Sequence, residues 1–223
     1  MKRQGRRPNP VECTTAKTRQ NFGFPVLAAV MWCFALGAGT AALLRFEFTA
    51  GDQARAAGQW PEGSLLPRSA GARTLLLFAH PHCVCTQASL DELQVIMSQA
   101  PDALHAQVVF VQLPGFTDAE VQGGSWDQAG RIRGLTRRVD INGAEARRFQ
   151  AKVSGYTVVY DALGRLEFDG GITGSRGQTG ANAGRNSVMR LLQTGTAEVR
   201  RTKVFGCYLF DRGEHSKHHA RGA

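Results

Sequence analysis

Cysteine is scarce in this sequence, and its scarcity excludes one class of protein. Five cysteines among 223 residues are too few to build a small scaffold held together by disulfides. A disordered chain is excluded as well, because hydrophobic residues make up 43% of the sequence and charged residues only 20%. The length suits one ordinary domain with extensions.

The central part of the chain has almost no surplus of positive charge. Residues 1–22 carry a net charge of +5 and residues 198–223 a net charge of +3, so residues 23–197 hold only +1 of the total of +9. A nucleic-acid-binding domain needs a basic face of its own, and these central residues cannot form one. We therefore expect no nucleic-acid partner.

Several catalytic and cofactor motifs are missing. The sequence has no GK[ST] phosphate motif, no CxxCH haem-attachment motif and no Ser-His-Asp arrangement that its spacing reveals. The glycine-rich residues 170–177 follow a predicted strand, so we expect them to shape the rim of a site, where Arg176 is placed to hold an anion. We expect no resident cofactor.

Residues 24–44 form an uncharged, apolar run of 21 residues. A helix of that length spans about 30 Å, the thickness of a bilayer core. Because basic residues precede the run and few follow it, the positive-inside rule predicts a single-pass anchor in a bacterial inner membrane. Residues 1–22 are then a basic cytoplasmic tail, residues 23–45 the anchor, and the rest of the chain lies in the periplasm.

A cleaved signal peptide is the alternative for this segment. The small residues 37–42 fit one, but apolar residues resume at Leu43 and no A-x-A motif closes the run. We favour the uncleaved anchor, and both interpretations export the soluble part. Residues 46–70 are rich in Gly, Ala and Pro without apolar periodicity, which predicts a linker.

Residues 71–196 have the pattern of an α/β domain. Apolar runs predict strands at 74–79, 108–111, 157–160 and 165–168, with a hairpin turn at 161–164. Helical spacing predicts helices from just after Cys85 to Pro101, and at 126–135, 144–152 and 185–192. The order is β-α-β-α-β-β-α, with a parallel crossover first, which is the element order of a thioredoxin fold with a mixed sheet.

The segment from His80 to Cys85 reads HPHCVC and joins the first predicted strand to the first predicted helix. Backbone N–H groups at a helix N-terminus stabilise an anion, so a thiol there loses its proton more readily than usual. Cys83 is therefore the predicted nucleophile. Pro81 and the N–H groups of the helix start position it, and a charged His82 would add to the effect.

The spacing of Cys83 and Cys85 is unusually tight for a redox pair. Residues two apart lie on opposite sides of a regular helix, so we expect Cys83 in the non-helical entry and Cys85 in the first turn. A disulfide between them is strained, which favours the dithiol.

The sequence resembles the thioredoxin superfamily and, within it, membrane-anchored RedB-like proteins. The matching segments are HPHCVC (80–85), SGYTVVYDALGRLEFDGGITGSRG (154–177), NAGR (182–185) and VFGC (204–207), within residues 71–210. The resemblance implies a thiol–disulfide or related redox role outside the cytoplasm, with a protein thiol or disulfide as partner.

The chain departs from that superfamily at two places. The pair is CxC rather than CxxC, and Gly155 and Tyr156 stand where a cis-proline normally faces the cysteines. We expect Gly155 to provide the same close backbone approach. In the redox hypothesis, Cys83 attacks and Cys85 resolves the mixed disulfide. The missing proline also leaves open an anchored interaction module with a degenerate site.

Metal delivery is the other alternative for the same residues. His80, His82, Cys83 and Cys85 offer imidazoles and thiols within six residues, a donor set that suits Cu(I). For His80 alone, packing or capping of the turn is the simpler role.

Cys207 is a candidate third thiol. It lies in an apolar stretch, residues 204–210, within the charged C-terminal segment 197–223 that ends in a histidine-containing tail. We expect this stretch to dock on the domain. It then brings Cys207 to the CxC pair as a resolving cysteine or metal ligand, or buries it as a structural cysteine.

Overall fold

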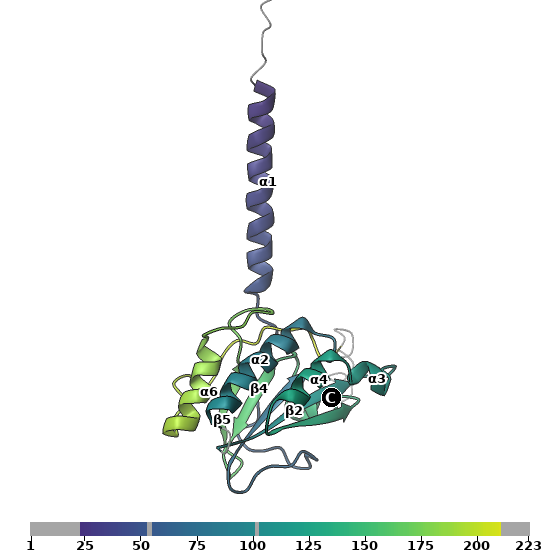
Figure 1. Cartoon of the computed structure of the whole chain (residues 1–223), viewed down its shortest axis with the longest axis vertical. Coiled ribbons are helices and arrows are strands. Elements are labelled where there is room, and N and C mark those ends of the chain that lie inside the picture. Colours follow the sequence, from purple (N-terminus) through teal and green to yellow (C-terminus); the bar gives the residue numbers. More distant parts are fainter. Residues whose placement is uncertain (1–22, 53–54, 101–102, 211–223) are drawn as a thin grey trace, which may run out of the picture. The chain divides into compact units, whose positions relative to one another are not determined.

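Helix α1 (Gly23–Glu47) carries the uncharged run seen in the sequence. The computed structural model describes residues 23–52, 55–100 and 103–210 (Figure 1), so the predicted basic tail and the histidine-containing end lie outside the described residues. By length and composition, Pro25–Glu47 is apolar enough to cross a membrane, as an anchor or as a signal sequence. Its large apolar side chains, including Trp32 and Phe34, are exposed.

The chain divides into two units, Met1–Leu43 and Leu44–Ala223. The second contains a sheet of five strands in the order β3-β2-β1-β4-β5. The strands are β1 (Arg73–Ala79), β2 (Leu104–Gln112), β3 (Leu135–Ile141), β4 (Tyr156–Tyr160) and β5 (Leu166–Gly171). β1 pairs parallel with β2 and antiparallel with β4, β2 pairs parallel with β3, and β4 pairs antiparallel with β5. This is the predicted thioredoxin-like fold with a mixed sheet.

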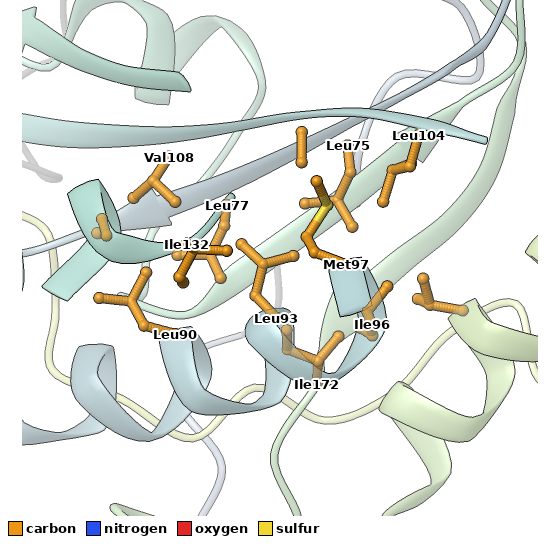
Figure 2. Packing of buried hydrophobic residues seen from close by; sticks show 14 of the residues in the cluster. Leu75, Leu77, Leu90, Leu93, Ile96, Met97, Leu104, Val108, Ile132 and Ile172 are labelled. Carbon is orange, nitrogen blue, oxygen red and sulfur yellow. The ribbon is translucent and has the colours of Figure 1, made fainter. Parts of the chain in front are cut away.

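Helices α2 (Val84–Gln99), α4 (Gly124–Arg131) and α6 (Ala183–Thr194) cover one face of the sheet (Figure 1). Figure 2 shows Leu90 and Leu93 of α2 packed toward Leu75 and Leu77 of β1. The alternate residues of β1 point to the other face, where they pack in a second apolar cluster. β1 is therefore buried on both faces, as its apolar sequence predicts.

The short helices α3 (Asp118–Val121) and α5 (Ala144–Arg148) complete the unit. α5 contributes to the second apolar cluster, where Ala146 is fully buried.

Strand β3 corrects the prediction of a helix over residues 126–135. The helix ends at Arg131, Gly134 takes a positive φ of 79°, and the chain continues as a strand paired with β2. β3 lies at the edge of the sheet and exposes Arg137 and Arg138. An edge strand with charged residues lacks the apolar run that identifies a buried strand, so the sequence does not reveal it.

Of the predicted linker, residues 46 and 47 belong to α1, and the described residues 48–52 and 55–70 form no helix or strand of their own but contact the second apolar cluster. Trp60 packs edge-on against Phe149 and Tyr160, with ring centroids 5.0 and 5.3 Å apart. The apolar stretch near the C-terminus docks on the same cluster, because Val204, Leu209 and Phe210 are buried there.

Candidate functional site

The two cysteines of the CxC motif lie at the junction of β1 and α2. Cys83 is the N-cap residue of α2, with an extended backbone (φ −92°, ψ 123°), and Cys85 lies in the first helical turn. The tight spacing predicts one cysteine before the helix and one in its first turn, and the structure places them there. Both side chains are buried, at 3% and 6% relative exposure, while Val84 between them is exposed. The sulfur atoms thus lie in a protected position at the positive end of a helix.

A small hydrogen-bond network holds the loop before Cys83. The Ser154 hydroxyl accepts from the backbone N–H of His80 at 2.9 Å and lies 2.7 Å from the Thr86 hydroxyl. The Thr86 hydroxyl donates to the His80 carbonyl at 2.9 Å. The backbone N–H of Cys83 also donates to that carbonyl, at 3.2 Å, so the turn is fixed on both sides. Sequence reasoning missed Ser154 and Thr86, whose one signal is their position beside Gly155 and Cys85.

Cys207 is brought to the CxC pair from the far end of the chain. Its Sγ lies 2.9 Å from the Sγ of Cys83, and the residue is exposed. The C-terminal stretch runs antiparallel to the loop before β4. The backbone N–H of Ser154 donates to the Cys207 carbonyl at 2.8 Å, and that of Leu209 to the Lys152 carbonyl at 2.9 Å. Cys83 therefore has a thiol neighbour on its own helix and another on this stretch.

These neighbours make Cys83 the acidic thiol of the group. Hydrogen bonds from the Cys85 thiol first, then from the Cys207 thiol and the backbone N–H groups of both residues, lower the pKa of Cys83 despite its burial. The pKa of Cys85 is raised, because its proton is held by the Cys83 sulfur and burial disfavours its thiolate. Burial and the contact with Cys83 raise the pKa of Cys207 as well. These shifts favour the thiolate at Cys83, with the thiols of Cys85 and Cys207 as its hydrogen-bond donors.

The histidines of the motif are directed elsewhere. His82 Nε2 donates to the Glu120 carbonyl at 2.8 Å, and its ring stacks on Phe116 at an interplanar angle of 17°. His80 Nδ1 accepts from the backbone N–H of His82 at 3.2 Å, which is the predicted turn-capping role. Burial lowers the pKa of His80, which favours its neutral form. Pro81 is buried in the same turn.

The predicted copper donor set of His80, His82, Cys83 and Cys85 stays a prediction. Within residues 23–52, 55–100 and 103–210, no group of three or more His, Cys, Asp or Glu side chains is arranged to hold a metal ion. His80 and His82 each use a ring nitrogen in the contacts just given.

Gly155 lies close to β1 and to Ser89 of α2, while its predicted approach to the cysteines stays a prediction. Its φ is +86°, its N–H donates to the Phe78 carbonyl at 2.8 Å, and a Cβ there would lie 2.8 Å from the Ser89 hydroxyl. The described residues contain no cis peptide bond. Tyr156, also predicted to support the site, instead donates its hydroxyl to Asp169 at 3.3 Å and packs in the second apolar cluster.

The glycine-rich residues 170–177 contribute to the rim, as expected. The backbone N–H of Gly177 donates to the sulfur of Cys85. The Arg176 guanidinium donates to the Gly206 carbonyl at 2.6 Å and favours the thiolate of Cys207 by its charge. Arg176 thus holds the residue beside the third thiol.

No protein-family model and no curated protein matches this chain. Among solved structures, it is similar to a hypothetical protein from Sinorhizobium meliloti 1021, with 14% identity over 72% of this chain and 97% of that one (TM-score 0.57). It is also similar to an uncharacterized conserved protein from Geobacillus kaustophilus, with 15% identity over 74% and 93% of the two chains (TM-score 0.53).

The exposed lipoprotein thioredoxin of Streptococcus pneumoniae is also similar, with 18% identity over 56% of this chain and 85% of that one (TM-score 0.41). Similarity at these identities concerns the fold alone. These similarities therefore do not establish an activity or a resemblance to RedB-like proteins.

Proposed function

We propose that the soluble unit is an extracytoplasmic thiol–disulfide oxidoreductase in which Cys83 is the attacking thiolate. The observation that carries the proposal is the position of Cys83, a buried N-cap residue of α2 whose Sγ lies 2.9 Å from that of Cys207. Hydrogen bonds from Cys85 and Cys207 lower the pKa of Cys83, which supports the same interpretation. The thiolate is the nucleophile in disulfide exchange. A structural cysteine in an apolar core would have the opposite shift, because burial alone disfavours the thiolate.

The reaction follows from this arrangement. The Cys83 thiolate attacks one sulfur of a partner disulfide, forms a mixed disulfide and releases the other partner sulfur as a thiolate. A second thiol of the chain then attacks the Cys83 sulfur, forms an intramolecular disulfide and releases the remaining partner sulfur. The partner disulfide is reduced to two thiols, and two thiols of this chain are oxidised. The CxC spacing makes Cys85 a candidate for the resolving thiol.

The resemblance to membrane-anchored RedB-like proteins supports an anchored role for α1. In this proposal Pro25–Glu47 stays in the bacterial inner membrane, the second unit faces the periplasm, and the partner is a protein thiol or disulfide. Disulfide chemistry suits that compartment, since the cytosol keeps thiols reduced.

A nucleophile test decides the redox proposal. The full chain is purified in detergent and reduced, and its reaction with oxidised glutathione is followed by mass spectrometry. We expect Cys83→Ser to abolish formation of the mixed disulfide and its intramolecular product, while Cys33→Ser, a change in α1 outside the site, leaves both unchanged. A Cys83→Ser protein that exchanges at the wild-type rate would refute the proposal.

The same preparation tests the other hypotheses. Reduced protein is mixed with Cu(I) and a competing chelator while free thiols are counted. Tight one-to-one binding that protects Cys83 and Cys85 would replace the redox proposal by metal delivery. If the protein neither retains copper nor exchanges disulfides, the result favours an interaction module with a degenerate site.

A further inference from the structure

The position of Cys207 identifies a partner for Cys83 that the CxC spacing does not. The Cys83 and Cys207 sulfurs are 2.9 Å apart, within about 1 Å of the ~2.05 Å of a disulfide bond. The two cysteines belong to separate elements, the start of α2 and the docked C-terminal stretch. Closing this gap requires a small shift of the stretch, with no change to a helix.

The backbone around Cys85 opposes the alternative bond. Cys83 is the extended N-cap residue and Cys85 lies in the first helical turn, and a disulfide between them needs Cβ atoms ~3.5–4.5 Å apart. The first turn is fixed by the N–H of Thr86, which donates to the Cys83 carbonyl at 2.9 Å. The Cys85 carbonyl accepts from the Ser89 hydroxyl at 3.0 Å. Movement of Cys85 toward Cys83 therefore acts against these helical contacts, whereas Cys207 lies outside the helix.

The C-terminal stretch is held on both sides of Cys207. Before it, Gly206 lies against Ser154 so closely that a Cβ at Gly206 would be 2.0 Å from the Ser154 carbonyl oxygen. The Arg176 guanidinium donates to the Gly206 carbonyl at 2.6 Å. After it, Leu209 is buried and its backbone pairs with Lys152. Cys207 is thus kept near Cys83 by its neighbours, which gives it a high effective concentration.

We propose that Cys207, rather than Cys85, resolves the mixed disulfide on Cys83, so that the oxidised protein holds a Cys83–Cys207 bond. The inference rests on the proposed function, which supplies the oxidant as a partner disulfide. Cys207 loses its proton to solvent and its sulfur attacks the Cys83 sulfur. The bond between Cys83 and the partner breaks, and the partner sulfur leaves as a thiolate. Cys85 remains a thiol that donates to the Cys83 sulfur.

The bond has a structural consequence. It fastens the C-terminal stretch covalently to the site, and reduction releases that link while the backbone pairing with Ser154 remains. The redox state of the pair therefore controls whether the stretch, residues 204–210, can leave the edge of the loop before β4.

Peptide mapping distinguishes the two bonds. The reduced full chain in detergent is treated with oxidised glutathione, free thiols are alkylated, and the protein is digested with trypsin. Cleavage after Arg73 and Lys203 places Cys207 in the peptide 204–212 and both motif cysteines in the peptide 74–131. We expect these two peptides to be disulfide-linked in the wild type and in Cys85→Ser, and unlinked in Cys83→Ser.

The kinetics give a second measurement. In Cys207→Ser we expect the glutathione adduct on Cys83 to persist about tenfold longer or more, because the tethered resolving thiol is gone. Gly206→Ala, which displaces the stretch and leaves all thiols in place, should lower the yield of the linked peptides. Near-ultraviolet circular dichroism verifies that each variant is folded.

The outcomes separate the two proposals. If peptide 204–212 is fully alkylated while Cys83 and Cys85 are both protected within 74–131, the CxC pair forms the disulfide and the inference is overturned, although the proposed function stands. If Cys83 forms no glutathione adduct at all, the proposed function itself fails.

Discussion

At the scale of single residues, the lowered pKa of Cys83 depends on its thiol neighbours. Its N-cap position supplies backbone N–H groups, and Cys85 and Cys207 supply thiol donors. The histidine beside it in sequence contributes less than the motif suggests, because the His82 ring is held by Glu120 and Phe116. The pKa of Cys83 is therefore set mainly by the sulfur groups of Cys85 and Cys207.

Replacement of Cys85 tests this dependence. Cys85→Ala removes the largest cause of the lowered pKa of Cys83, so we expect that pKa to rise toward the ordinary value of about 8.5. In the wild type the Cys83 thiolate persists well below that pH and is lost as the pH falls through its lowered pKa. The measurement is the rate of iodoacetamide alkylation of Cys83 against pH, with Cys33→Ala as control. An unchanged pH profile would contradict the prediction.

At the scale of elements, the site depends on how α2 is held. Its N-terminus carries Cys83 and Cys85, and its middle is tied to α6 by an ion pair between Glu92 and Arg185 with a distance of 2.8 Å. The Glu92 side chain is only 2% exposed and that of Arg185 17% exposed. Removing one partner of a buried pair leaves the other charge uncompensated.

This pair predicts a large loss of stability. We expect Glu92→Ala to lower the free energy of unfolding by about 3 kcal/mol, measured by urea denaturation of the reduced full chain in detergent. Glu198→Ala is the matched control, because its pair with Arg190 is exposed on both sides (63% and 57%) and such pairs contribute about 0–1 kcal/mol. Equal losses in the two variants would contradict a special role for Glu92.

At the scale of the whole molecule, the chain divides into an apolar helical unit and a unit that contains the sheet. The unit from Leu44 to Ala223 has its own sheet and two apolar clusters. The helix exposes its apolar side chains, an arrangement that suits a lipid surrounding.

Fractionation and mass measurement test the anchor. We expect the full chain to remain in the membrane after extraction with alkaline carbonate, at the mass of all 223 residues. A shorter, carbonate-soluble product that begins near residues 37–42 would indicate a cleaved signal peptide instead.

Local patterns were enough to predict much of the fold and part of the site. β1 and the start of α2 follow from an apolar run and from helical spacing, both of which act between neighbouring residues. The placement of Cys83 before the helix and Cys85 within it follows from the same local geometry. β3 was missed because an edge strand with exposed arginines carries no such pattern.

The apolar helix, the order of elements apart from β3, and a cysteine at a helix N-terminus follow from the amino-acid sequence alone, because each depends on contiguous residues. Only the tertiary structure placed Cys207 against Cys83, across a separation of 124 residues. It also directed Tyr156 to Asp169 and His82 to Glu120. Such contacts depend on how distant segments pack, and spacing along the chain carries no record of that packing.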